Sequence, residues 1–501
     1  MNYVLSLDVG TSSIRAALYD ERGEPVPGAA AGVSHAPAAS PDGGVEMDAE
    51  ALLQRSLGCV EQVLRLAGER ARRIAGVGIS TFWHSILGVR ADGLPATPVL
   101  MWADTRSVAE VAELRSRLDE RALHARTGAL LHTSYPGPRL LWAAHHRPEW
   151  LRESARWMSP GEYFHARLFG APACSISMAS GTGFYHHQAG QWDETFLSEL
   201  PVRAEQLSPI VDTGTPFVGL TPELAARLPQ LSDVPWFPAA GDGACSNVGS
   251  GCVSPERVAL MVGTSGAVRV MAEGPAPETP WGLWRYRWDA RRYLQGGALS
   301  NGGSLFAWLR DTLKLPAAEE LEAALSAGEP DGHGLTVLPF LAGERCPGWR
   351  GDARAAIVGL SWSTRPEEIL RAGLEAVAYR FALIHELLAP VAAPEHQIVA
   401  TGGALLASPA WTQMVADALG REVAASRVEE ASARGAALLA LEGAGLIRDL
   451  RDLPAPLGRV FSPDPERHAR YREARERQAK LYQALVGTDW AGAGSGLIRG
   501  A

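Results

Sequence analysis

Apolar positions close to the N-terminus form one short continuous run, Val4 to Leu7, which predicts a buried strand. Asp8 ends this run, although a buried carboxylate is costly unless it meets a cation or a good hydrogen-bond donor. Gly10 permits a tight turn, and three hydroxyl side chains follow it at positions 11–13. This order suits an anion with a metal ion beside it. An ordinary hairpin turn has the same composition, so the stretch alone leaves both interpretations open.

The same pattern recurs about half a chain later, where residues 260–270 read LMVGTSGAVRV. Both copies contain VGTS, starting at Val9 and at Val262, between an apolar run and a second strand-like run. The repeat predicts two domains of one architecture, each opening with a hairpin whose turn can hold a phosphate through backbone N–H groups and hydroxyls. Met261 stands where the first copy has Asp8, so one carboxylate would serve one Mg²⁺ in an ATP site between the domains.

The remaining pattern of apolar and polar positions predicts further elements. They are an Ala-, Pro- and Gly-rich surface segment over 25–45, a helix near 48–67, a buried strand over 74–80, a hairpin from 85–89 and 98–102, a polar helix over 108–127, a half-buried strand over 284–288 and a charged helix over 464–485. Residues 487–501 are predicted to be a disordered tail.

Two helices in the second half of the chain have ends that the sequence marks. Thr364 and Glu367 predict a capping box for a core helix. Ser408 predicts an N-cap, with Pro409 at the first helical position and Gly420 just after the last. The preceding IVATGG is a strand that runs into a Gly-Gly pair. That pair fits either a tight strand-to-helix turn or a close approach of the backbone to an adenine or ribose.

Composition narrows the class of protein. The chain has 501 residues, which predicts about two to four domains. Its net charge of −9 and the absence of a long basic run argue against a nucleic-acid partner. The sequence contains neither an apolar stretch long enough for a membrane span nor a signal-peptide pattern. Five cysteines without CxxC spacing predict reduced thiols in a cytoplasmic protein and no zinc site.

A second carboxylate stands in a turn rich in small residues, PWFPAAGDGACSNVGSG (235–251). Asp242 in this turn can accept the proton of a hydroxyl that attacks a phosphoryl donor, although Asp-Gly turns without any function are common. The usual nucleotide-binding motifs, GxxxxGK[ST] and a strand-associated GxGxxG, are absent from the sequence. A P-loop enzyme and a Rossmann dehydrogenase are therefore disfavoured.

Five motifs, in order, resemble those of the FGGY family of carbohydrate kinases. They are DVGTSSIR, GDGACSNVGSG, MVGTSGA, GERCPGWRGDARAAIVGLSWSTRPEEILRAGLEAVAYRF and TGGALLASPAWTQMVADALGREV. The resemblance spans about residues 3–445. It implies an α/β fold of two ribonuclease-H-like domains around a central cleft, as in actin, hexokinase and the Hsp70 ATPase domain. The implied domains are residues 1–246 and 254–446, followed by a C-terminal helix and tail over 447–501.

The resemblance also implies roles for single residues. Asp8 would serve Mg²⁺, and Asp242 would be the general base for the acceptor hydroxyl. The residues implied to bind ATP are Thr11, Ser12, Ser13 and Arg15 at the phosphates, Gly263 and Thr264 from the second domain, and Gly303, Gly403 and Ala404 at the nucleoside. The implied partners are thus ATP, Mg²⁺ and a small sugar or sugar acid. The oligomeric state is not predicted, and a homo-oligomer is compatible with the sequence.

The motifs STFWHS (80–85), MWADTRS (101–107) and TSYPGPRLLW (133–142) are most similar to the gluconate kinase branch of the family. The acceptor residues they imply are Trp83, His84, Asp104 and Arg106 together with Asp242, and His84 with Arg106 are expected to pair the carboxylate of gluconate. Trp83 and Trp102 fit core packing as well. Arg139 departs from the lysine expected in this branch, which leaves a ketopentose or another sugar or polyol open as the acceptor.

A non-kinase of the same fold is the alternative from another class. An actin- or Hsp70-like ATPase that drives a binding partner, or an inactive sugar sensor, would share the architecture. An inactive relative is expected to lose Asp8 or Asp242, and both are present.

Overall fold

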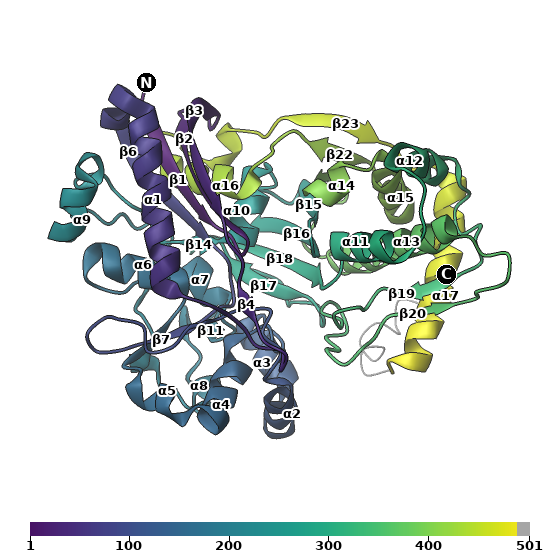
Figure 1. Cartoon of the computed structure of the whole chain (residues 1–501), viewed down its shortest axis with the longest axis horizontal. Helices are drawn as coiled ribbons and strands as arrows, with labels where there is room; N and C mark the ends of the chain where they lie inside the picture. Colours follow the sequence, from purple (N-terminus) through teal and green to yellow (C-terminus); the bar gives the residue numbers. More distant parts are fainter. Residues whose placement is uncertain (488–501) are drawn as a thin grey trace.

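The computed structural model describes residues 1–487 and contains two large sheets (Figure 1). The first sheet has the order β14-β6-β1-β2-β3, and the second has the order β17-β18-β16-β15-β21-β22-β23. The strands of the first sheet are β1 Tyr3–Val9, β2 Ser13–Asp20, β3 Pro25–Ser34, β6 Ile74–Thr81 and β14 Ala240–Gly241. Those of the second are β15 Arg257–Val262, β16 Gly266–Glu273, β17 Trp284–Arg287, β18 Arg292–Leu299, β21 Gln397–Thr401, β22 Val423–Ser426 and β23 Leu457–Phe461.

The two sheets share one topology. The series β3-β2-β1-β6-β14 corresponds strand by strand to β18-β16-β15-β21-β22, with antiparallel pairs first and parallel pairs after the central strand. β17 and β23 extend the edges of the second copy. The predicted fold class, two ribonuclease-H-like α/β domains, is therefore confirmed, and the VGTS repeat marks equivalent hairpins.

Helices and short strands complete the two halves. The helices of the first half are α1 Ala49–Ala67, α2 Val108–Arg117, α3 Glu120–Thr127, α4 Pro136–His146, α5 Pro148–Glu153, α6 Pro160–Phe169, α7 Ile176–Ser180, α8 Glu194–Leu197, α9 Pro222–Arg227 and α10 Asp242–Gly249. Those of the second half are α11 Gly303–Thr312, α12 Ala318–Ala327, α13 Pro366–Leu387, α14 Gly403–Leu406, α15 Pro409–Leu419, α16 Ala431–Gly443 and α17 Pro465–Leu485. The short strands are β4 Ala38–Ala39, β5 Val45–Met47, β7 Leu87–Val89, β8 Val99–Leu100, β9 Arg156–Met158, β10 Cys174–Ser175, β11 Tyr185–His186, β12 Gln191–Trp192, β13 Ile210–Val211, β19 Thr336–Leu338 and β20 Ala356–Val358.

Several predicted elements are confirmed with their boundaries. Asp48 caps α1 by accepting a hydrogen bond from the Ala51 amide, and the strand predicted over 74–80 is β6. The side chain of Ser408 caps α15, and Gly420 follows that helix in the left-handed conformation. The charged helix predicted over 464–485 is α17. The tail prediction falls, apart from Gly487, outside the described residues.

The segment over 25–45 lies at the surface as predicted, and its first part is the strand β3. β3 forms the edge of the first sheet, where a strand of alanines and glycines is held by its ladder to β2 rather than by its own propensity. The strand predicted as half-buried, β17, is buried along nearly its whole length because Arg285 lies inside as well as Trp284 and Tyr286.

Three other local predictions are corrected. The polar helix predicted over 108–127 is two helices, because Asp119 ends the first run and caps α3. The hairpin over 85–102 forms through two isolated antiparallel bridges, Ile86 with Leu100 and Val89 with Pro95, rather than as a continuous ladder, while β7 and β8 pair with β9 and β5. The capping box of α13 lies one residue later than predicted, since Pro366 takes the first helical position and Glu368 accepts from the Arg365 amide.

Helix α16 joins the two halves of the chain. Although it follows the second sheet in sequence, it packs against α10 and against β1 and β6 of the first sheet (Figure 1). The approach to α10 is close, because a Cβ atom on Gly435 would lie 1.9 Å from the Cys245 carbonyl oxygen. Only glycine fits at such a crossing.

We expect Gly435→Ala to destabilise the protein, although alanine is the better helix former. The new methyl group would overlap the backbone of α10 and force the two helices apart, at a cost of about 1–3 kcal/mol. Gly58→Ala in the middle of α1 is the matched control. A Cβ atom there meets nothing within 4 Å, so this variant should gain up to about 1 kcal/mol. Urea unfolding measures both changes, and a stable Gly435→Ala variant would contradict the close crossing.

Candidate active site

Asp8 lies near the end of β1, opposite Ser80 of the parallel neighbour β6. Asp8 is 4% exposed, and its Oδ1 atom has no hydrogen-bond partner within residues 1–487. Burial raises the pKa of Asp8 to about 7, and the negative charge of Asp242 adds to the effect. A divalent cation would bond the free carboxylate oxygen and stabilise the ionised form that burial disfavours. Asp8 therefore fits the metal role predicted for it.

Asp242 begins α10 directly after β14, on the other side of β6 from Asp8. Its Oδ1 accepts a hydrogen bond from the Gly243 amide at 2.7 Å. Burial raises the pKa of this carboxylate, whereas the nearby guanidinium of Arg269 lowers it. The structure thus brings the two predicted carboxylates together at neighbouring strand ends, where parallel α/β sheets present their ligand-binding edge.

The first hairpin turn presents its hydroxyl groups beside these carboxylates. Thr11, Ser12 and Ser13 are partly or fully exposed, and the Gly10 amide bonds to the Ser13 carbonyl. Arg15 lies across the ladder from Asp8, with Nη1 3.9 Å from its Oδ2. The Arg15 Nε is 3.2 Å from Glu430, which precedes α16. Arg15 therefore meets carboxylates of both halves of the chain.

The second hairpin turn is in contact with two of the other residues predicted to bind the nucleotide. The Gly303 amide at the start of α11 donates to the Gly263 carbonyl at 2.8 Å. A Cβ atom on Gly303 would lie 2.7 Å from the Ala404 side chain. Thr264 is exposed at the tip of the turn, and Gly403 begins α14 facing open space. The N-termini of α11 and α14 thus lie beside this turn.

Trp83 and His84 form a wall of aromatic rings between the two halves. Trp83 is 5% exposed and packs so closely on Gly241 that a Cβ atom there would lie 1.8 Å from its ring. His84 lies 4.9 Å from the Tyr135 ring, and the Tyr135 hydroxyl bonds to that of Tyr286 across the halves. Trp83 therefore shapes the site mainly by packing beside Asp242.

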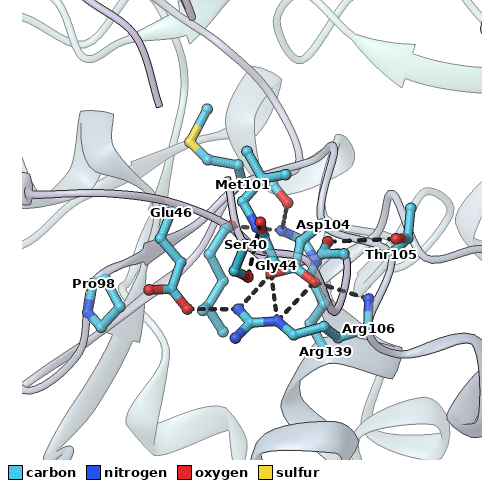
Figure 2. A network of polar contacts seen from close by, with 12 residues as sticks. Ser40, Gly44, Glu46, Pro98, Met101, Asp104, Thr105, Arg106 and Arg139 are labelled. Carbon is cyan, nitrogen blue, oxygen red and sulfur yellow. Dashed lines mark hydrogen bonds and ion pairs between the residues drawn. The ribbon is translucent and has the colours of Figure 1, made fainter. Parts of the chain in front are cut away.

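Arg106 is already paired inside the first half (Figure 2). Its Nη2 lies 2.6 Å from Glu46 Oε1, and its Nε lies 3.0 Å from Asp104 Oδ2. The guanidinium also stacks 4.2 Å from the ring of Trp142. Asp104 is 1% exposed, so both carboxyl oxygens serve the protein itself.

This geometry corrects the expected carboxylate clamp of His84 and Arg106. Burial lowers the pKa of His84 to about 3, so the imidazole is neutral at pH 7, and its Nδ1 bonds to the Gly181 carbonyl. Arg106 is already paired with Glu46 and Asp104, and His84 takes no part in these ion pairs. Neither residue offers an acceptor a free positive charge. The sequence could not reveal that Arg106 pairs with Glu46, because the two residues are 60 positions apart.

Arg139, which stands where a lysine was expected from the gluconate kinase branch, has a structural role next to the site. It is 1% exposed, and its five N–H groups point at the backbone carbonyls of residues 84, 100, 101, 134 and 135. Burial lowers its pKa to about 9. Since every donor is used on the backbone, Arg139 fixes the loops around His84 and does not extend toward a ligand.

Two guanidinium groups from the second half also face the site, and the sequence analysis did not single them out. Arg269 on β16 lies over the start of α10, where a Cβ atom on Gly243 would be 3.2 Å from its Nη2. Arg345 lies in the loop between β19 and β20 and stands 5.5 Å from the Trp102 ring. A cation inside the apolar strand AVRVMA was the signal that could have identified Arg269.

A further cluster of titratable side chains consists of Asp331, His333 and Glu375. One possible metal-ligand atom from each of them lies within 4.8 Å of the others. Glu375 is fully buried and accepts from Arg371 as well as from His333. Tyr471 of α17 donates to the same carboxylate. This cluster therefore connects α13 to α17, and we assign it a structural role.

The active-site residues suit phosphoryl transfer between two bound groups. A carboxylate that can take a proton stands at the start of α10, and two hairpin turns with hydroxyl and amide donors flank it. Residues 3–249 match the N-terminal domain of the FGGY family of carbohydrate kinases, and residues 258–444 match its C-terminal domain. The chain belongs to the FGGY family of carbohydrate kinases. It is therefore an ATP-dependent sugar kinase.

FGGY kinases with different acceptors are similar to this chain. A gluconokinase of Bacillus subtilis (strain 168) is 29% identical over 97% of this chain and 94% of its own length. The crystal structure of gluconate kinase from Lactobacillus acidophilus has a TM-score of 0.89, is 27% identical and covers 99% of both chains. The ligand-bound xylulose kinase of the same organism also has a TM-score of 0.89, at 26% identity over 99% of this chain and all of that one.

The FGGY assignment agrees with the other observations on the chain. Its acceptor is a small sugar molecule, and its phosphate donor is ATP. Among residues 1–487, no helix is both long and apolar enough to cross a membrane.

Proposed function

We propose that the chain phosphorylates D-gluconate with ATP to give 6-phosphogluconate. The observation that carries the chemistry is the position of Asp8 and Asp242 on either side of β6, between the two hairpin turns. Support for the acceptor comes from the gluconokinase of Bacillus subtilis and the gluconate kinase of Lactobacillus acidophilus, both similar over nearly the whole chain.

Asp242 orients the 6-hydroxyl of the acceptor and accepts its proton as the bond to phosphorus forms. Burial raises the pKa of Asp242 and so makes it a better proton acceptor, while Arg269 and the N-terminus of α10 oppose that rise. Trp83 restricts the position of this carboxylate from the side by packing on Gly241 and Gly243. The acceptor is thereby held on one side of the domain junction.

Amides and hydroxyls of the two turns hold the ATP phosphates from both domains. Thr11, Ser12 and Ser13 act from the first, and Gly263 and Thr264 act from the second. Gly303, Gly403 and Ala404 lie against the nucleoside. Asp8 would hold Mg²⁺, which supplies neutralisation of the phosphate charge when bound. Arg15 links the turn to Glu430 and so connects phosphate binding to the position of α16.

A ketopentose is the second candidate acceptor, because the xylulose kinase of Lactobacillus acidophilus superposes equally well, with a TM-score of 0.89. Glycerol is a third class, represented among the similar kinases.

ADP release with Mg²⁺-ATP, measured against D-gluconate, D-xylulose, D-ribulose and glycerol, tests the acceptor. We expect kcat/KM for gluconate to exceed that of each neutral acceptor at least about 100-fold, as discrimination built on charged hydrogen bonds allows. Preferred turnover of xylulose would replace gluconate by the ketopentose. If ATP binds and none of these four acceptors turns over, the proposal of D-gluconate as the acceptor fails.

A further inference from the structure

The acceptor side of the active site carries unbalanced positive charge. Arg269 is 7% exposed, and its Nε and Nη1 atoms have no hydrogen-bond partner within residues 1–487. The Nε of Arg345 is likewise without a partner there. The negative charge of Asp242 acts to raise the pKa of both guanidinium groups, against the effect of burial. The buried Arg269, the half-buried Arg345 and one carboxylate leave about one positive charge, and such an excess is costly where the site is desolvated.

Arg345 comes from the loop between β19 and β20 of the second half. Its Nη2 is anchored to the Leu299 carbonyl at 2.9 Å, and its guanidinium faces Trp102 of the first domain. Its charge also acts on His84 and His132, whose pKa values burial lowers to about 3. These two histidines are neutral at pH 7, so they neither compete with Arg345 for an anion nor add to its charge.

Arg269 occupies the end beside Asp242. Its Nη2 lies over Gly243, next to the carboxylate that takes the proton. Burial lowers the pKa of Arg269 to about 10, and Asp242 opposes that change. The guanidinium stays charged at pH 7, because its pKa remains well above that value.

We propose that Arg345, with Arg269 supporting it, holds the carboxylate of a sugar-acid acceptor, in place of His84 and Arg106. This inference rests on the proposed function and names the residues that select an acid over a neutral sugar. The Leu299 carbonyl takes Nη2 of Arg345, whereas Nε has no partner within residues 1–487 and would donate to the carboxylate, with a hydroxyl of the same acid at Asp242. One bound carboxylate would balance the excess charge.

The position of Arg345 distinguishes this role from ATP binding. The hairpin turns that hold phosphate carry Gly10 and Gly263, whereas Arg345 lies against Trp102 of the first domain. Since it comes from the second domain and acts on the first, a bound carboxylate would also bridge the two domains.

D-Gluconamide, which differs from D-gluconate in lacking the charge, is the matched probe. We expect the wild-type enzyme to have a KM for gluconate at least about 30-fold below that for gluconamide. Arg345→Met should raise KM for gluconate at least about 30-fold and remove this preference, with KM for ATP changed less than about threefold. Arg345→Lys should keep part of the preference, because it keeps the charge but loses the planar fork.

Each outcome decides one claim. Wild-type enzyme that turns over a neutral sugar but not gluconate overturns the proposed function and this inference with it. Wild-type enzyme that prefers gluconate, with an Arg345→Met variant that keeps the preference, overturns this inference alone. An equal rise of KM for ATP and for gluconate assigns Arg345 to phosphate binding instead. Thermal unfolding and ATP-dependent stabilisation of the variant show whether it is folded.

Discussion

Replacing Asp242 by Asn is expected to lower kcat about 1,000-fold, within the range for loss of a general base, while leaving the affinity for ATP nearly unchanged. The amide has the size of the carboxylate but cannot take the proton of the acceptor hydroxyl. The hydrogen bond from the Gly243 amide can be kept by the Asn oxygen, so the start of α10 should remain in place. Steady-state kinetics with ADP detection and calorimetric titration with an ATP analogue measure the two effects.

Asp92→Asn is the control for this variant, because Asp92 is an exposed turn carboxylate in the same half of the chain. It should retain wild-type kcat. An Asp242→Asn enzyme with near-normal turnover would remove Asp242 from the role of base. Loss of ATP binding together with turnover would indicate a disturbed site rather than missing proton transfer.

Asp8→Asn is expected to abolish most activity and yet to stabilise the ligand-free protein at alkaline pH. Burial raises the pKa of Asp8 from 3.8 to about 7, so folding favours the protonated form. The resulting penalty is absent below about pH 4, grows as the pH rises, and is complete above about pH 7, where it amounts to at most about 4 kcal/mol. Asparagine, which does not ionise, removes it.

Thermal unfolding of wild type and Asp8→Asn at pH 5 and pH 8, without nucleotide or metal, tests the sign. The variant should gain several degrees in Tm over wild type at pH 8 and less at pH 5. Its kcat should fall about 100-fold or more if Asp8 serves the metal at the phosphates. A Tm difference that is larger at pH 5 would contradict the assigned shift, and retained activity would contradict the metal role.

The repeated pattern in the sequence predicted two domains of one architecture, and the resemblance to the FGGY family implied their fold class. Val9 and Val262 begin equivalent turns, and identical strand order in the two sheets is the structural form of that repeat. Local capping chemistry also predicted α15, since Ser408, Pro409 and Gly420 act within one helix. Features that depend on neighbours in sequence were thus accessible before the structure.

Features that depend on residues far apart in the sequence could not be predicted from it. Arg106 looked like a ligand for an anion until Glu46 and Asp104 were found beside it. A charged residue inside the apolar strand AVRVMA marked Arg269 as unusual, but nothing nearby in sequence shows that its guanidinium lies over Gly243 or that its Nε and Nη1 have no partner within residues 1–487. The charge that a substrate meets is what remains after the side chains of the protein have paired with one another, and only the folded structure shows which of them pair.

The packing of α16 on the first sheet has a consequence for how the chain is made. Translation delivers β1 and β6 early, but their cover, residues 431–443, is added only after most of the second sheet has been synthesised. Until then the surface around Gly78, where the Ala436 backbone later sits, stays open to solvent. A ribosome-bound nascent chain of the first half alone should therefore bind chaperones, and a recombinant fragment ending before residue 431 should aggregate.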